Sequence, residues 1–218
     1  MKYKYHKLGL ALLALTIITT SSSFAAAPFN DIEFSRYKSD ILMLQEKGII
    51  HGKGKDKFDP YAVLTMAEGI HLINASFGLN LDHVRFFKEP LATDYFINAD
   101  DNAWYAYGLI IASVNGVELK NDLVPTAKFT KEAFIAAVVG YMEVKYDMPM
   151  IKIGVADIAD SEEMSVEFSG VLQRAIYYGI IELDDKNMLH PKTELSREEA
   201  ARIINRLVEY MDKSHFTR

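Results

Sequence analysis

The sequence predicts an all-α protein, and two observations lead to that prediction. Ser196 and Glu199 stand three residues apart in front of an apolar run, which is the spacing of a helix capping box. Behind them, apolar side chains recur at helical spacing, as expected for a helix with one buried face. These side chains are Ala200, Ile203, Ile204, Leu207, Val208 and Met211.

The second observation is that this pattern occurs three times. In each copy a glycine is followed by a proline, and five residues after the proline stands the hydroxyl residue that starts a helix. The three triplets are Gly48, Pro60 and Thr65; Gly116, Pro125 and Thr130; and Gly179, Pro191 and Ser196. Self-similarity at a fixed period indicates stacked structural units. We therefore expect three helix–loop–helix repeats packed about a pseudo-threefold axis into one domain.

Each repeat is expected to have a first helix that ends at its glycine and a second that starts at its hydroxyl residue. The glycine suits the left-handed position that follows a helix. In repeat 1 the first helix carries Tyr37, Ile41 and Leu44, and the second starts at Thr65. In repeat 2, Trp104 opens the first helix and Thr130 starts a second, strongly apolar one. The first helix of repeat 3 carries Phe168, Val171, Leu172, Ala175 and Ile176.

The three boxes differ at the residue after the hydroxyl group. Repeat 3 has Arg197 there, repeat 2 has Lys131, and repeat 1 has Met66. We expect the guanidinium of Arg197 to point outward beside backbone amides that have no partner within the helix, where it would suit a carboxylate. The alternative is a helix cap with a solvated arginine. In repeat 2, Ala133 cannot close the capping box.

The beginning of the chain has the layout of a secretory signal peptide. Three lysines precede an apolar run over residues 8–18, and Ala25, Ala26 and Ala27 offer small residues for cleavage. The run is too short for a bilayer, which needs about 20 residues. We expect residues 1–27 to be removed and no membrane span to remain, which would leave a secreted protein at the cell wall or cell surface.

Composition excludes several classes of function. Residues 28–218 carry 21 basic and 30 acidic residues, a net charge of −9, which argues against a nucleic-acid partner. The chain has no cysteine, so disulfides and thiolate chemistry are excluded. The histidines show no metal-binding spacing, and no nucleophile motif is present. We expect no catalytic residues, no metal and no cofactor.

The connection between repeats 1 and 2 contains a basic and aromatic cluster, residues 85–88. Such a cluster can serve a sugar or nucleic-acid surface, or it can belong to a linker whose phenylalanines pack on the fold.

Several of these motifs together resemble the S-layer homology domain family, whose domains usually occur as three tandem copies. The first repeat shows Phe29 to Ile32, then Gly48 to Gly52, then Phe58 to Pro60 and the box from Thr65 to Glu68. The third shows Val155 to Ile158 and the box at Ser196. The resemblance places the repeats at residues 28–78, 95–144 and 154–213 of one composite domain, 28–218. It implies a three-pronged spindle with ligand grooves between neighbouring prongs.

The resemblance also implies a ligand, a secondary cell-wall polysaccharide whose terminal sugar carries a pyruvate ketal. Carried over to this sequence, it makes Arg197 the best pyruvate ligand and Lys131 a weaker one. It makes Asp31, Gly52, Trp104 and Asp157 candidates for hydroxyl contacts or stacking; the alternative for Trp104 is a core aromatic. The leading hypothesis is thus a non-catalytic, noncovalent wall-binding module. The alternative is a degenerate relative that binds a surface protein, and an exported enzyme is disfavoured.

Overall fold

The computed structural model describes residues 29–54, 56–148 and 156–214, and within these ranges the chain forms helices and no strand. This confirms the predicted all-α class. The expected signal peptide and Val155 lie outside the described residues. The α-helices are α1 (Lys38–Glu46), α2 (Met66–Phe77), α3 (Ala106–Val114), α4 (Lys131–Lys145), α5 (Val166–Tyr177) and α6 (Arg197–Lys213). Two short 3₁₀ helices, Ala92–Asp94 and Ser161–Glu163, precede α3 and α5.

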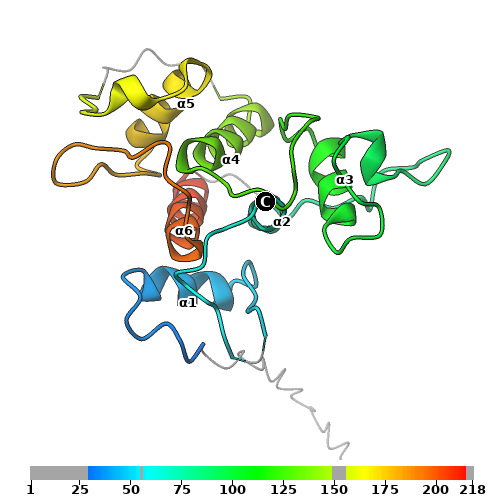
Figure 1. Ribbon diagram of the computed structural model, residues 1–218, viewed down its shortest axis with the longest axis horizontal. Coiled ribbons are helices and arrows are strands. Elements are labelled where there is room, and N and C mark those ends of the chain that lie inside the picture. The colour runs from blue at the N-terminus through cyan, green and yellow to red at the C-terminus, as the bar shows by residue number, and fades with distance from the viewer. Residues whose placement is uncertain (1–28, 55, 149–155, 215–218) are drawn as a thin grey trace, which may run out of the picture.

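Helices α2, α4 and α6 form the centre of the molecule, and the other three lie around them (Figure 1). We call the outer segments prong 1 (residues 29–62, with α1), prong 2 (79–127, with α3) and prong 3 (156–193, with α5). Helix α1 packs on α6, α3 packs on α2, and α5 packs on α4. Each outer helix therefore packs on the inner helix of a different repeat, and the pairing of α1 with α6 joins the two ends of the described chain.

A closed ring of three backbone hydrogen bonds lies where the inner helices begin. The amide of Leu64 donates to the carbonyl of Leu195 (2.8 Å), Leu195 donates to Phe129 (2.9 Å), and Phe129 donates to Leu64 (2.9 Å). All three side chains are buried. Because the ring uses the same position in each repeat, it gives the centre of the fold an approximate threefold symmetry.

The predicted helix starts are confirmed. The hydroxyl groups of Thr65, Thr130 and Ser196 each accept a hydrogen bond from the amide three residues later, and the boxes at Thr65 and Ser196 are complete. As expected, the box at Thr130 lacks its second half, since Ala133 has no carboxylate to return. The first helices also end as predicted, with Gly48, Gly116 and Gly179 at φ of +68°, +83° and +70°.

The core fills the space between inner and outer helices with large apolar side chains. The bulkiest fully buried ones are Phe77, Phe129 and Phe134, and the rings of the last two meet edge to face at 5.4 Å. Within the described part of the chain, no helix combines the length and apolar character that crossing a membrane requires.

Candidate functional site

Arg197, the first residue of α6, lies against prong 1 and is engaged there. Its Nε donates to the carbonyl of Phe58 (2.9 Å), and its guanidinium lies 4.7 Å from the centre of the Phe58 ring. One terminal nitrogen is 3.7 Å from the Glu68 carboxylate, and the side chain is only 11% exposed. Burial lowers the pKa of Arg197, while the carboxylates of Glu68, Asp59 and Asp31 oppose that shift. The expected outward-pointing guanidinium is therefore wrong, because α6 starts against prong 1 rather than in solvent.

The backbone amides beside Arg197 are also occupied. The amide of Arg197 donates to the carbonyl of Ala62 (2.9 Å), and that of Glu198 donates to Pro60 (2.9 Å). The next amide, of Glu199, donates to the hydroxyl of Ser196 (3.3 Å). Helices α2 and α4 use their first two amides in the same way, on carbonyls of prongs 2 and 3. The free amides expected at this helix start are thus absent, since the neighbouring prong satisfies them.

Asp31 accepts hydrogen bonds from the backbone amides of Phe58 and Asp59, both at 2.9 Å, and so fixes the loop against which Arg197 lies. Desolvation raises the pKa of Asp31, but the backbone hydrogen bonds outweigh it and the pKa is lowered. In prong 3 the equivalent contacts belong to Asp160, which accepts from the amides of Leu189 (2.8 Å) and His190 (2.7 Å).

The alignment of Asp157 with Asp31 is consequently three residues out of register. Asp157 is exposed, whereas Asp160 is 4% exposed and holds the loop. The sequence signal was misleading because Asp157, like Asp31, is followed by an isoleucine, whereas Asp160 is followed by Ser161. The hydrogen bonds to the distant loop show that Asp160 is the counterpart of Asp31.

Lys131 occupies the place of Arg197 in repeat 2, but its surroundings differ. It lines a groove of about 370 Å³ between prongs 1 and 3, with α6 as its floor. We call this the Lys131 groove. Burial lowers the pKa of Lys131, and the more distant carboxylates of Glu199, Asp160 and Asp184 oppose that shift. Among the described residues, none forms a hydrogen bond or an ion pair within 4.0 Å with the Lys131 ammonium.

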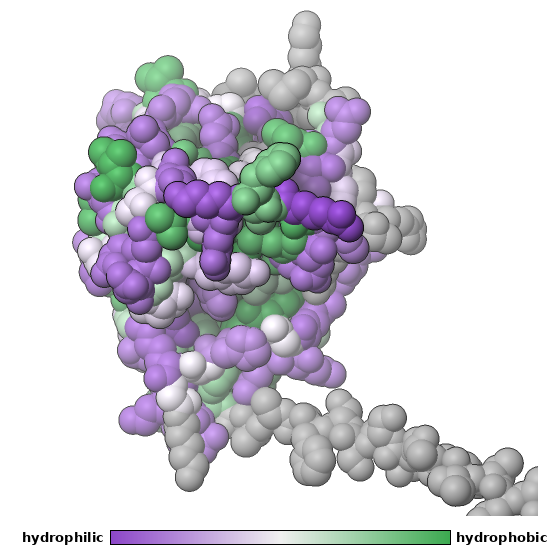
Figure 2. Space-filling model, turned by 90° about the vertical axis from the view of Figure 1, so that its right-hand side faces the viewer, coloured by the Kyte–Doolittle hydropathy of each residue, from purple (hydrophilic) through white to green (hydrophobic). Residues whose placement is uncertain are grey.

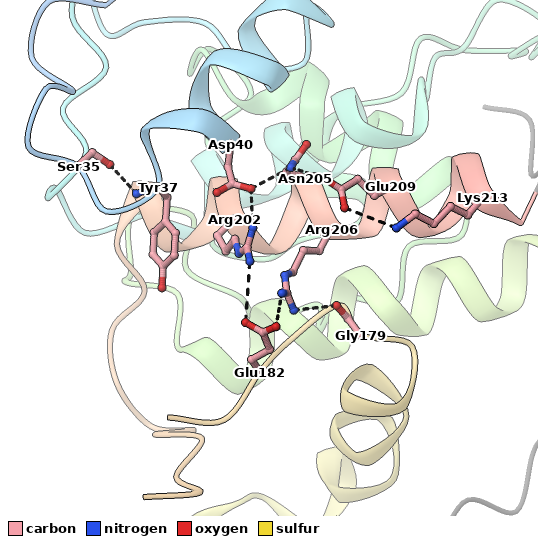
Figure 3. A network of polar contacts seen from close by, with 10 residues as sticks. All are labelled: Ser35, Tyr37, Asp40, Gly179, Glu182, Arg202, Asn205, Arg206, Glu209 and Lys213. Atoms are coloured by element: carbon pink, nitrogen blue, oxygen red, sulfur yellow. Dashed lines mark hydrogen bonds and ion pairs between the residues drawn. The ribbon is translucent and has the colours of Figure 1, made fainter. Parts of the chain in front are cut away.

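The carboxylates of the Lys131 groove are already engaged. Asp40 receives Arg202 (2.9 Å) and the side-chain amide of Asn205 (2.8 Å). Glu182 pairs with Arg206, and Arg202 also lies 3.9 Å from it. Figure 3 shows how these groups tie α1, α6 and the segment after α5 together. The remaining carboxylate, that of Glu199, closes the capping box of α6.

Arg36 is the second cation of this groove that lacks a carboxylate within 4.0 Å among the described residues. It is exposed, and its guanidinium lies 5.6 Å from the ring of Tyr37, which also lines the groove. Sequence reasoning missed Arg36, Tyr37 and Arg202. A signal existed for the first, because Arg36 precedes Gly48 by the same twelve residues that separate Trp104 from Gly116.

Trp104 is 66% exposed, which rules out the core aromatic considered from the sequence. Its ring meets His71 at 6.4 Å and Tyr105 at 5.8 Å, both edge to face. His71 lies three residues after Glu68 on α2, so the two share one face of that helix. Through Glu68 and His71, Trp104 and Arg197 therefore belong to the same side of the molecule, separate from the Lys131 groove.

Gly52 and Met66 have structural surroundings. A Cβ at Gly52 would lie 2.4 Å from the carbonyl oxygen of Lys57 and 2.9 Å from the Phe29 ring, so this position requires glycine for packing. Met66 is partly buried against the core. Among the described residues, no cluster of His, Asp and Glu side chains has the arrangement of a metal site.

Comparison with known proteins relates part of this chain to a known domain family. The family model for the S-layer homology domain matches residues 160–201, from Asp160 to the first turns of α6. An amylopullulanase of Thermoanaerobacterium thermosulfurigenes is 27% identical over 184 residues, which cover 83% of this chain and 9% of that protein. The surface-layer 125 kDa protein of Lysinibacillus sphaericus is 25% identical over 210 residues, 93% of this chain and 16% of that protein.

A third relative, an endoglucanase of Bacillus sp. (strain KSM-635), is 24% identical over 225 residues and covers 95% of this chain. The chain spans only 23% of that endoglucanase, and still smaller shares of the other two relatives. The similarity to two enzymes and a surface-layer protein thus concerns a small part of each, alongside the family match in prong 3 and α6. Residues 160–201 therefore match the S-layer homology domain, a non-catalytic cell-wall anchoring module, and the chain as a whole is similar to short parts of a surface-layer protein and of two enzymes.

Proposed function

We propose that this chain attaches noncovalently to a secondary cell-wall polysaccharide, and that a terminal sugar bearing a pyruvate ketal binds in the Lys131 groove. One observation carries the proposal. Arg36 and Lys131 both line the groove, and among the described residues neither has a carboxylate partner within 4.0 Å. The carboxylates of Asp40, Glu182 and Glu199 already have hydrogen-bond or ion-pair partners. The groove therefore has unpaired positive charge available for an anionic ligand.

The chemistry of the groove suits a sugar acid. A ketal carboxylate favours charge-assisted hydrogen bonds, and Arg36 offers a planar fork while Lys131 offers a compact charge. Tyr37 adds an aromatic ring on which a sugar face can pack. A volume of about 370 Å³ lies within the range of small-ligand sites, about 300–1,000 Å³.

The side of the molecule that carries Arg197 and Trp104 is our second candidate for a glycan site. There Trp104 provides an exposed ring, but a carboxylate ligand has to compete with Glu68 and the Phe58 carbonyl for the guanidinium. We therefore rank Lys131 above Arg197 as a pyruvate ligand, in contrast to the order suggested by the sequence. In repeat 1 the equivalent residue is Met66, which has no positive charge for a carboxylate.

Calorimetry with a synthetic pyruvylated disaccharide tests the proposal, with the unpyruvylated disaccharide as the matched ligand. The parent chain should bind only the pyruvylated sugar. Lys131→Ala should weaken binding by on the order of 2 kcal/mol, since a partly buried carboxylate loses its partner. Lys186→Ala, at an exposed residue that does not line the groove, should bind like the parent.

Two results would refute this site. Equal binding of both sugars would remove the role of the carboxylate, and unchanged binding by Lys131→Ala would remove the role of the groove. Arg197→Ala separates the two candidates, because it should alter glycan affinity less than Lys131→Ala does.

The polymer itself is tested by pull-down with purified cell walls before and after chemical removal of the secondary polysaccharide. Binding should be lost with the polysaccharide. Retention on stripped walls would instead favour a protein or peptidoglycan partner, and would contradict the proposed ligand.

A further inference from the structure

Exposed apolar side chains are concentrated on prong 2. Among the described residues, fourteen large hydrophobic side chains are exposed, and eight of them lie between Val84 and Val124. Figure 2 shows this side of the molecule, where apolar patches lie between polar ones. Clusters of exposed apolar surface on a water-soluble domain mark interaction sites.

Part of this surface is hollowed. The segment between α2 and α3 lies beside the outer face of α3 and encloses a groove of about 410 Å³, which we call the prong 2 groove. Its apolar lining comes from Leu81, Val84, Phe86, Leu91, Tyr107 and Ile110. Two carboxylates, those of Glu89 and Asp101, belong to the same lining.

Next to this groove stands a fully exposed aromatic side chain. Phe87 has a relative exposure of 115%, and its neighbours in sequence on either side are Phe86 and Lys88, with Arg85 one residue further. Phe86 lines the prong 2 groove, so residues 85–88 divide their side chains between the groove and solvent. The linker interpretation of this cluster thus holds for Phe86 but leaves Phe87 without packing.

The net charge of prong 2 disfavours an anionic polymer or membrane as its partner. Residues 79–127 contain seven acidic and three basic residues, so their net charge of −4 repels phosphates and anionic lipids. Exposed Phe, Tyr and Trp side chains, which this prong carries, are enriched at protein interfaces.

We propose that two copies of this chain associate through prong 2, with Phe87 of each copy inserted into the prong 2 groove of the other. The two surfaces are complementary: Phe87 is an apolar knob with Arg85 and Lys88 close in sequence, and the groove is an apolar hollow whose lining includes the carboxylate of Glu89. The lining also includes Asp101, whose carboxylate accepts two hydrogen bonds from Thr93. Since the knob and the groove lie side by side on one prong, the exchange is reciprocal and closes as a twofold dimer. It does not depend on the glycan site proposed in the Lys131 groove, which lies between prongs 1 and 3.

Sedimentation equilibrium of the full chain is the first test. The parent should show a monomer–dimer equilibrium that depends on concentration, and Phe87→Ser should weaken association at least tenfold. Phe34→Ser is the matched control, because Phe34 is 91% exposed on prong 1, and this variant should associate like the parent. A parent chain that remains monomeric up to a concentration of about 1 mM overturns the proposal.

Disulfide cross-linking locates the interface. Because the chain has no cysteine of its own, only the introduced cysteines can form a disulfide. A mixture of the Phe87→Cys and Tyr107→Cys variants should form a disulfide-linked heterodimer on mild oxidation. If its yield does not exceed that of a Phe34→Cys and Tyr107→Cys mixture, the knob does not enter the groove and the proposed interface is wrong.

Reversing the charges of Arg85 and Glu89 tests whether these two side chains meet across the proposed interface. Arg85→Glu alone should weaken the dimer several-fold, and the double variant Arg85→Glu, Glu89→Lys should recover part of the loss. Absence of any recovery would show that these charges do not meet. Binding of a monomeric parent to anionic lipid vesicles, lost in Phe87→Ser, would assign Phe87 to a membrane and equally overturn the dimer.

Discussion

The carboxylate of Glu132 on α4 holds Ser165, the residue in front of α5, by two hydrogen bonds. It accepts from the backbone amide at 3.0 Å and from the hydroxyl at 2.8 Å, and it also pairs with Lys192. Glu132 is only 3% exposed, so a carboxylate is buried where an outer helix meets an inner helix of another repeat.

A second glutamate–serine pair lies where α1 meets α6, and two alanines stand in its place where α3 meets α2. Glu198 on α6 accepts from the hydroxyl of Ser35 (2.5 Å), just before α1. At the interface of α2 and α3, Ala67 has the place of the glutamates, two residues after the N-cap, and Ala103 precedes Gly116 by the same thirteen residues that separate Ser35 from Gly48. The acid and the hydroxyl are thus present together or absent together, as expected if an unpaired buried carboxylate is costly.

The first prediction concerns this contact. Ser165→Ala should lower the free energy of unfolding by about 1 kcal/mol, since one hydrogen bond to a buried carboxylate is lost. Glu132→Ala should cost more, about 2–3 kcal/mol, because it leaves the amide and Lys192 without their acceptor. Urea denaturation measures both values. Ser169→Ala on α5 is the control, and a loss as large as that of Ser165→Ala would show that the contact is not the cause.

The second prediction concerns the incomplete helix cap of α4. Ala133→Glu places a carboxylate where Glu68 and Glu199 close their boxes. It should raise the free energy of unfolding by about 0.5–1 kcal/mol, the usual contribution of such a cap. Thermal unfolding measures the gain, and Ala133→Leu, which cannot return a hydrogen bond, should not reproduce it. A destabilised Ala133→Glu variant would mean that the half-buried position cannot admit the side chain.

The third prediction compares two glycines inside inner helices. A Cβ at Gly69 on α2 would lie 2.5 Å from the Phe129 ring, whereas a Cβ at Gly140 on α4 meets nothing within 4 Å. Gly140→Ala should stabilise the chain by about 0.4–1 kcal/mol through the unfolded state. Gly69→Ala should destabilise it by about 1–3 kcal/mol through overpacking. The two midpoints of urea unfolding should shift in opposite directions, and shifts of the same sign would refute this account.

The fourth prediction concerns alkaline pH. Desolvation and the Glu143 carboxylate raise the pKa of Tyr178 to about 12 in the folded chain, from an ordinary value of 10.0. Its hydroxyl donates to Glu143 (3.1 Å), which Arg174 also holds. Because the folded state disfavours the tyrosinate, the contribution of Tyr178 is complete below pH 10 and is lost as the pH rises towards 12.

The free energy of unfolding should therefore fall between pH 10 and pH 12, and Tyr178→Phe should make that fall shallower. A smaller decline will persist, since burial also raises the pKa of Tyr141. Tyr177→Phe is the control, because Tyr177 is 63% exposed on the same helix. An equal slope in the Tyr178 and Tyr177 variants would rule out Tyr178 as the titrating group.

The local elements of this fold could be read from the sequence. Capping boxes at Thr65 and Ser196 and the apolar periodicity behind them predicted where the inner helices begin, and Gly48, Gly116 and Gly179 predicted where the outer ones end. These signals are reliable because each depends on residues within about one helical turn, whose contacts form wherever the helix is placed.

The tertiary structure alone decided which helices pack together and what the candidate ligands can do. The ring of Leu64, Phe129 and Leu195 joins segments about 65 or more residues apart, and no local pattern specifies its partners. That ring brings α6 against prong 1 and α2, where Phe58 and Glu68 engage Arg197, and it leaves Lys131 in a groove whose carboxylates are engaged by other residues. The cations Lys131 and Arg197 thus have different surroundings at the same motif position, because their electrostatic partners come from other parts of the chain.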